Sequence, residues 1–217
     1  MPYFDINKCN KELKNILFIH IPKTGGTSIE LYFSDKYHIK LDEEHLLTYM
    51  NSNKFFEGIS LQHQTLLNII NNNNIFKIDF NETDIITVIR NPYHRLLSDL
   101  FFLNIIKHDS DQDEIYKIVK NIFIENRTNR EKYDNHFTPQ YLFISDEYNN
   151  LYPNIKILRT ENLNNMMYEL GYIDFNNFHN KSSNKIEDID KYFNRLTKNI
   201  INKYYERDFI LFNYIIV

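Results

Sequence analysis

The strongest constraint on the fold is the stretch from residue 16 to residue 31, which reads ILFIHIPKTGGTSIEL. Residues 16–21 form a mostly apolar run that is short enough for a buried strand, and a proline and two glycines then interrupt it. Thr27 or Ser28 can serve as the N-terminal cap or as a first-turn hydroxyl of the helix whose apolar residues follow. The stretch therefore predicts a strand, a glycine loop and a helix, in that order.

This arrangement is suited to binding an anion. Gly25 and Gly26 carry no side chain, so successive backbone N–H groups can approach an oxyanion, and the helix N-terminus adds a partial positive charge. Lys23 adds a full charge, but it precedes both glycines, whereas the GxxxxGK[ST] loop of nucleoside triphosphatases places its lysine after the last one. That triphosphatase pattern is not met, and an ordinary strand-to-helix turn is the alternative.

A second strand and helix predict another part of the anion site. Residues 85–89 (IITVI) have the composition of an interior parallel strand and lead directly to Arg90. Asn91 is then expected to cap a helix that has Pro92 at its first position. Arg90 at the strand end and Ser98 two turns into the helix can point into one crevice, where a guanidinium binds phosphate well. Arg95 is expected instead to be a structural partner of a carboxylate.

A histidine follows a further predicted strand at residues 55–61 (FFEGISL). The carboxyl ends of strands line the ligand crevice in open α/β sheets, so His63 is a candidate general acid or base. A partly exposed loop histidine is the alternative. His20 lies inside the first apolar strand and is expected to be a packed, hydrogen-bonded histidine.

Composition indicates one globular domain spanning residues 1–217, because 42% of the residues are hydrophobic, with 17 Phe and 16 Tyr in the chain. The small net charge of −4 does not favour nucleic acid or an anionic membrane as a partner. Cys9 is the single cysteine, so no disulfide can form within the chain. The N-terminus lacks the apolar core of a signal peptide, and no apolar run reaches transmembrane length. We therefore expect a cytoplasmic protein, whose oligomeric state the sequence does not predict.

The segments PKTGGTS and IRNPYHRLLSDLFF together resemble the two cofactor motifs of the PAPS-dependent sulfotransferase superfamily, in its carbohydrate sulfotransferase branch. The resemblance implies that the first motif holds the 5'-phosphosulfate of 3'-phosphoadenosine 5'-phosphosulfate (PAPS) and that the second binds its 3'-phosphate. It also implies a histidine base between the motifs, where His63 stands. The cofactor-binding residues implied by the two motifs are Lys23, Thr24, Gly25, Gly26, Thr27, Ser28, Arg90 and Ser98.

The resemblance continues downstream. NHFTPQYLF is similar to the H-[FW]-x-P-Q segment of the same branch and implies acceptor contacts by His136 and Gln140, although His136 can equally brace the turn. FHNKSSN resembles a cofactor-side loop and implies Lys181 and Ser182 as further cofactor contacts, with a solvated loop as the alternative. Asp208, in a segment similar to the closing one of the family, is expected to be structural.

The implied reaction is sulfuryl transfer from PAPS to a hydroxyl acceptor, which leaves 3'-phosphoadenosine 5'-phosphate as product. His63 would accept the proton of the hydroxyl, and Lys23 with the loop amides would stabilise charge on the leaving phosphate, so no metal ion is required. Golgi-resident members carry a membrane anchor and lumenal disulfides, and we expect neither here, because the sequence has one cysteine and no apolar run of transmembrane length. We therefore expect a small glycan, a glycan terminus or another hydroxyl compound as acceptor, ahead of a proteoglycan chain.

Two other function classes stay open. A phosphotransferase that uses ATP or GTP needs Mg²⁺ held by the hydroxyl of GK[ST] and usually an Asp at the end of a neighbouring strand, where this chain has Arg90. A non-catalytic nucleotide-binding module would keep the anion site without a base, so His63 discriminates between these classes.

The expected fold is a single α/β domain with a central parallel sheet, helices on both faces, and the strand, loop and helix described above at its cofactor site. The expected strands are residues 16–21, 55–61, 85–89 and 155–158, and the expected helices include 42–50, 161–170 and 186–205.

Overall fold

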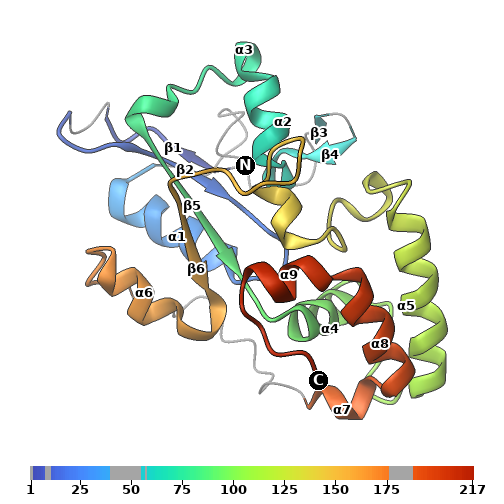
Figure 1. The fold of residues 1–217 in the computed structure, drawn as a ribbon. Coiled ribbons are helices and arrows are strands. Elements are labelled where there is room, and N and C mark those ends of the chain that lie inside the picture. The colour runs from blue at the N-terminus through green and yellow to red at the C-terminus, as the bar shows by residue number, and fades with distance from the viewer. Residues whose placement is uncertain (1, 8–10, 40–54, 57, 176–187) are drawn as a thin grey trace.

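A mixed sheet of four strands lies at the centre of the fold (Figure 1). The computed structural model of the chain describes residues 2–7, 11–39, 55–56, 58–175 and 188–217. In the order in which they pair, the strands are β1 (Tyr3–Phe4), β2 (Asn15–Ile19), β5 (Thr83–Ile89) and β6 (Ile155–Arg159). The expected α/β class is confirmed.

The sheet departs from the prediction at one edge, where β1 runs antiparallel to β2, whereas β2, β5 and β6 run parallel. Only residues 5–14 join β1 to β2, and a parallel pairing needs a crossover of about a dozen or more residues. The predicted central parallel sheet is therefore present as β2, β5 and β6, and β1 adds an antiparallel edge strand that was not predicted.

Both faces of the sheet are covered, and this explains the continuous apolar run of β2. Leu17 and Ile19 belong to one buried cluster, whereas Ile16 and Phe18 belong to another. A strand that is buried on both faces reads as an unbroken hydrophobic segment. The elements that contribute to the first cluster include α2 (Leu66–Asn71) and α3 (Asn73–Phe76), and those of the second include α1 (Gly26–Tyr37) and α6 (Leu163–Glu169).

A helical layer follows the carboxyl ends of the strands and holds a third buried cluster (Figure 1). The helices of this layer are α4 (Pro92–Phe102), α5 (Gln112–Asn126), α7 (Ile189–Tyr192), α8 (Arg195–Tyr204) and α9 (Glu206–Leu211). Among the described residues, no helix is long and apolar enough to cross a bilayer.

The strand predicted at residues 55–61 is wrong as a member of the main sheet. The chain there forms a separate antiparallel hairpin of β3 (Phe55–Phe56) and β4 (Ile59–Ser60). Gly58, which lies between the two strands, adopts a φ of 77°, a conformation open to glycine. A short 3₁₀ turn at Leu61–His63 then carries the candidate base.

The late helices follow the prediction only in part. Residues 160–170 form a 3₁₀ turn and then α6, close to the expected helix. The single helix expected over 186–205 is wrong, because α7 ends at Tyr192 and the Asn194 side chain caps a new helix by accepting a hydrogen bond from the Thr197 N–H at 2.9 Å. The helix expected at 42–50 lies outside the described residues.

Candidate functional site

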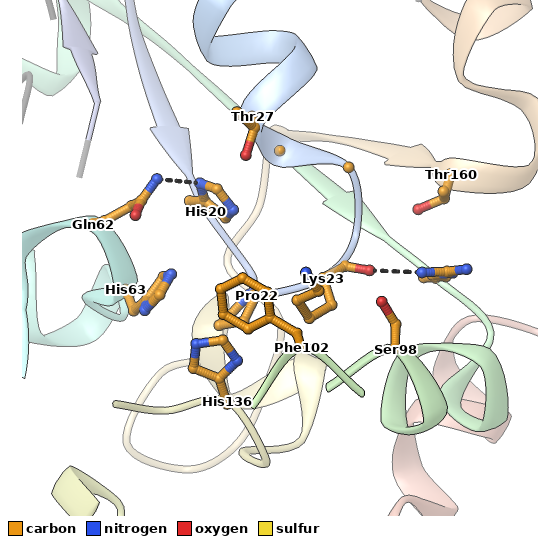
Figure 2. A pocket seen from close by; sticks show the side chains of 13 residues that line it. His20, Pro22, Lys23, Thr27, Gln62, His63, Ser98, Phe102, His136 and Thr160 are labelled. Carbon is orange, nitrogen blue, oxygen red and sulfur yellow. Dashed lines mark hydrogen bonds between the residues drawn. The ribbon is translucent and has the colours of Figure 1, made fainter. Parts of the chain in front are cut away.

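A cavity of about 290 Å³ opens where the three parallel strands end (Figure 2). His20 follows β2, Arg90 follows β5 and Thr160 follows β6, as expected for the ligand crevice of an open α/β sheet. The structure thus brings together the two predicted anion-binding segments and the candidate base. The lining residues are His20, Pro22, Lys23, Gly25, Gly26, Thr27, Gln62, His63, Arg90, Ser98, Phe102, His136 and Thr160.

The glycine loop leads directly into helix α1. Gly25 is the N-cap residue, with a left-handed φ of 89°, so Thr27 and Ser28 lie in the first turn of the helix, the second of the two places predicted for them. Gly26 lies against the His20 imidazole, and a Cβ atom on Gly26 would be 2.7 Å from His20 Nε2. Both glycines are therefore required, the first by backbone conformation and the second by space.

We expect Gly26→Ala to lower the free energy of unfolding by about 1–3 kcal/mol, the usual cost of overpacking a filled site. Urea denaturation of the variant and the unaltered chain measures the loss. The control is His20→Ala combined with Gly26→Ala, because removing the imidazole removes the clash and should make the two changes less than additive. Strict additivity would show that the imidazole is not what excludes a side chain at residue 26.

Most of the loop faces the cavity, with Thr24 as an exception. Pro22, Lys23, Gly25, Gly26 and Thr27 line it. Thr24 is fully buried and donates its hydroxyl to the Ile21 carbonyl at 2.8 Å. Only the backbone of Thr24 is left for a ligand. Ser28 is also buried, and its Oγ has no hydrogen-bond partner among the described residues.

Two cations share one side of the cavity. Arg90 donates a hydrogen bond from NH1 to the Lys23 carbonyl at 3.1 Å, and the Lys23 Nζ lies 3.7 Å from the centre of the Phe102 ring. Burial lowers the pKa of Lys23; the charge of Asp99 raises that pKa and the charge of Arg90 lowers it. Burial also lowers the pKa of Arg90. Buried charge of one sign is unfavourable until it is paired, so this side of the cavity is suited to an anion.

The guanidinium of Arg95 takes no part in lining the cavity, as predicted. It is 1% exposed and donates to three backbone carbonyls, those of Pro22 at 3.0 Å, Thr138 at 2.8 Å and His136 at 2.5 Å. A carboxylate partner was predicted for Arg95, and the structure provides Asp99, whose Oδ2 lies 4.0 Å from Arg95 Nε. Arg95 thus joins the glycine loop to the HFTPQ segment.

His63 is oriented by a carboxylate that the sequence analysis missed. Its Nδ1 lies 2.7 Å from Asp134 Oδ2, and the other oxygen of Asp134 accepts the Ser60 N–H at 2.7 Å. Because an ionised carboxylate only accepts, His63 donates from Nδ1 and keeps its lone pair on Nε2. Burial lowers the pKa of His63 to about 4, so the ring is neutral at neutral pH.

His63 is the middle one of three imidazoles that line the cavity. The ring centres of His20 and His63 are 5.4 Å apart, and those of His63 and His136 are 5.1 Å apart. His20 pairs through Nδ1 with Glu30, which confirms that it is a packed, hydrogen-bonded residue. His136 pairs through Nδ1 with Asp99 at 2.7 Å, and it both borders the cavity and braces its own turn through its carbonyl.

Gln140 lies elsewhere than the resemblance implies. It is fully buried, and its side-chain amide accepts from the Arg90 N–H at 2.8 Å and donates to the Arg90 carbonyl at 2.9 Å. Asp208 accepts the backbone N–H groups of Gln140 and Tyr141, each at 2.8 Å, which agrees with its expected structural role. Gln140 therefore positions Arg90 and does not line the cavity. Lys181 and Ser182 lie outside the described residues.

Thr160 and Phe102 are among the lining residues that were not singled out from the sequence. The Thr160 hydroxyl contacts the carbonyls of Thr24 at 2.5 Å and Ile89 at 3.1 Å and so joins the ends of the parallel strands. Phe102, the last residue of α4, is 57% exposed and covers the Lys23 ammonium. Phe102 lies four residues after Ser98, one helical turn, and this spacing could have signalled it.

Comparison with known proteins gives a family-level match. The model of the sulfotransferase family matches residues 9–215, nearly the whole chain. No curated protein and no solved structure matches it. The matched range includes every lining residue of the cavity.

Proposed function

Because the chain belongs to the sulfotransferase family, we propose that it transfers a sulfuryl group from PAPS to a hydroxyl of a carbohydrate acceptor, with His63 as the base. The observation that carries the proposal is the shared cavity. His63, with its lone pair directed by Asp134, lines the same cavity as Lys23, Arg90 and Ser98. A base and an anion site must face each other for in-line transfer.

The residues around the cavity fit the donor. Lys23 and the N–H groups of the glycine loop would hold the 5'-phosphosulfate, and Arg90 with Ser98 would hold the 3'-phosphate. The buried, unpartnered Oγ of Ser28 supports a ligand oxygen near the start of α1. When bound, PAPS supplies an activated sulfuryl group whose leaving group is a phosphate. Lys181 and Ser182 remain proposed contacts on the strength of their sequence resemblance.

The side chains have separate tasks in the proposed step. His63 Nε2 accepts the acceptor's proton as the new oxygen–sulfur bond forms, and Asp134 stabilises the resulting imidazolium. Lys23 and the loop amides stabilise the negative charge on the phosphate oxygen as its bond to sulfur breaks. These groups supply the required charge, and the proposed transfer therefore needs no metal ion.

The acceptor would enter between His63, His136 and the exposed ring of Phe102 (Figure 2). The likeness of the HFTPQ segment to the carbohydrate branch supports a glycan, and the small cavity favours a short glycan or a glycan terminus. A single cysteine agrees with the proposed cytoplasmic location.

The proposal is tested by offering radiolabelled PAPS with glycans, peptides and small hydroxyl compounds and reading which of them becomes labelled. We expect label in a glycan and none with a Lys23→Ala variant. Labelling of peptides or phenols alone would overturn the carbohydrate assignment. Binding of adenosine 3',5'-bisphosphate without labelling of any acceptor would favour a non-catalytic module.

A further inference from the structure

Two histidines and a carboxylate meet beside the cavity, and the proposed transfer uses only two of them, His63 and Asp134. His63, Asp134 and His136 each offer one nitrogen or oxygen atom, and these atoms lie within 4.8 Å of one another. Two imidazoles and a carboxylate are a ligand set that Zn²⁺ and similar divalent transition metals favour. We propose that these three residues form a transition-metal site whose occupation switches off the base.

The contact between His63 and Asp134 determines where the metal would bind. Asp134 lies on the Nδ1 side of the ring, 2.7 Å from that nitrogen. A metal ligated by both residues must therefore take the place of the Nδ1 proton. Ligand bonds of about 2.0–2.2 Å to each atom require only a modest widening of this contact.

His136 is prepared as the second nitrogen ligand. Its Nδ1 lies 2.7 Å from Asp99 Oδ1, which leaves the lone pair on Nε2 and fixes the ring. A carboxylate behind the other ring nitrogen is the usual support of a metal-binding histidine. His20 does not join the set, because Glu30 holds its Nδ1 and its Nε2 is packed against Gly26.

Metal binding at His63 Nδ1 would also affect the proposed transfer, and the switching role rests on that proposed function. A neutral imidazole with metal on Nδ1 carries its proton on Nε2, so the proton lost at one nitrogen is balanced by one gained at the other. Nε2 is then a donor and cannot accept the proton of a hydroxyl. Lys23 and Arg90 are not ligands, so affinity for a 3',5'-bisphosphate should not change.

The binding test uses the full chain and ZnCl₂ in isothermal titration calorimetry, with MgCl₂ in parallel. We expect one Zn²⁺ site and no Mg²⁺ binding there, because Mg²⁺ prefers oxygen ligands. His136→Gln and Asp134→Asn should each weaken Zn²⁺ binding at least tenfold. Two matched controls should bind as the unaltered chain does: His108→Gln, which removes an exposed histidine outside the cavity, and Cys9→Ser, which removes the thiol.

Nitrogen NMR of the histidine rings tests the same site without any substitution. Zn²⁺ should move the proton of His63 from Nδ1 to Nε2 and perturb His136, and EDTA should reverse both changes. Unchanged Zn²⁺ affinity in His136→Gln and Asp134→Asn, loss of binding in Cys9→Ser, or an unaltered His63 tautomer would each overturn the site. These measurements involve no turnover, so they stand apart from any failure to find an acceptor. With a labelled acceptor in hand, Zn²⁺ should abolish labelling, and full labelling at saturating Zn²⁺ would refute the switching role.

Discussion

Replacing His63 with alanine is expected to lower turnover by roughly two to four orders of magnitude, the usual range for loss of a general base. The affinity for adenosine 3',5'-bisphosphate should stay close to that of the unaltered chain, because the proposed donor contacts come from Lys23, the glycine loop and Arg90. Single-turnover kinetics with radiolabelled PAPS measures the first quantity, and calorimetry with the bisphosphate measures the second.

Asp134→Asn is a second variant that tests the same role of His63. The amide keeps the shape of the carboxylate but stabilises the imidazolium less, so turnover should fall while the fold and the bisphosphate affinity are retained. Equal losses of turnover and bisphosphate affinity in His63→Ala would point to a structural role, since His63 is largely buried. An unchanged rate would remove His63 from the reaction, and His136, 5.1 Å away between ring centres, would be tested next.

A second large effect is expected for the choice of nucleotide. If Arg90 and Ser98 hold the 3'-phosphate and the Lys23 loop holds the 5'-group, as proposed, adenosine 3',5'-bisphosphate should bind far better than AMP, ADP or ATP. Arg90→Ala should remove most of this preference, because losing a charge-assisted hydrogen bond costs about 1.5–3 kcal/mol, roughly tenfold to a hundredfold in affinity. Calorimetry with each nucleotide, with and without EDTA, measures it.

Arg90 also contacts the Lys23 carbonyl at 3.1 Å, so the variant needs controls that separate charge from loop geometry. Arg90→Lys keeps the charge but not the planar fork and should retain part of the preference. Arg207→Ala removes an exposed arginine that donates to the Asn149 carbonyl, outside the cavity, and should leave the preference intact. Tighter binding of Mg-ATP than of the bisphosphate, or binding abolished by EDTA, would favour phosphoryl transfer instead.

Local sequence patterns predicted the parts of the site that are built within one strand and the helix after it. The run before Lys23 and the run before Arg90 each became an interior strand, and the residues after them became the first turns of α1 and α4. Asn91 caps α4 as expected, by accepting the Tyr93 N–H at 3.0 Å. Such features depend on neighbours in the chain, namely hydrophobic period, glycine conformation and capping, and these can be read in order.

Tertiary structure alone decided which carboxylate serves which histidine. Asp134 is 71 residues from His63 and Asp99 is 37 residues from His136, and no local pattern connects either pair. The same holds for Gln140, whose side chain binds the backbone of Arg90 across 50 residues. A buried polar side chain must find a hydrogen-bond partner, but the partner's identity depends on which elements the packed core brings together.

The hairpin of β3 and β4 likewise combines a feature that the sequence predicted with one that only the tertiary structure decided. Its residues have strand composition, and this much was visible in the sequence. The sequence did not show which strand this segment would pair with: β3 pairs with β4, and among the described strands of the main sheet only β1 and β6 are edge strands. Strand propensity is a property of residues, whereas membership of a sheet depends on which hydrogen-bonding edges the rest of the chain leaves free.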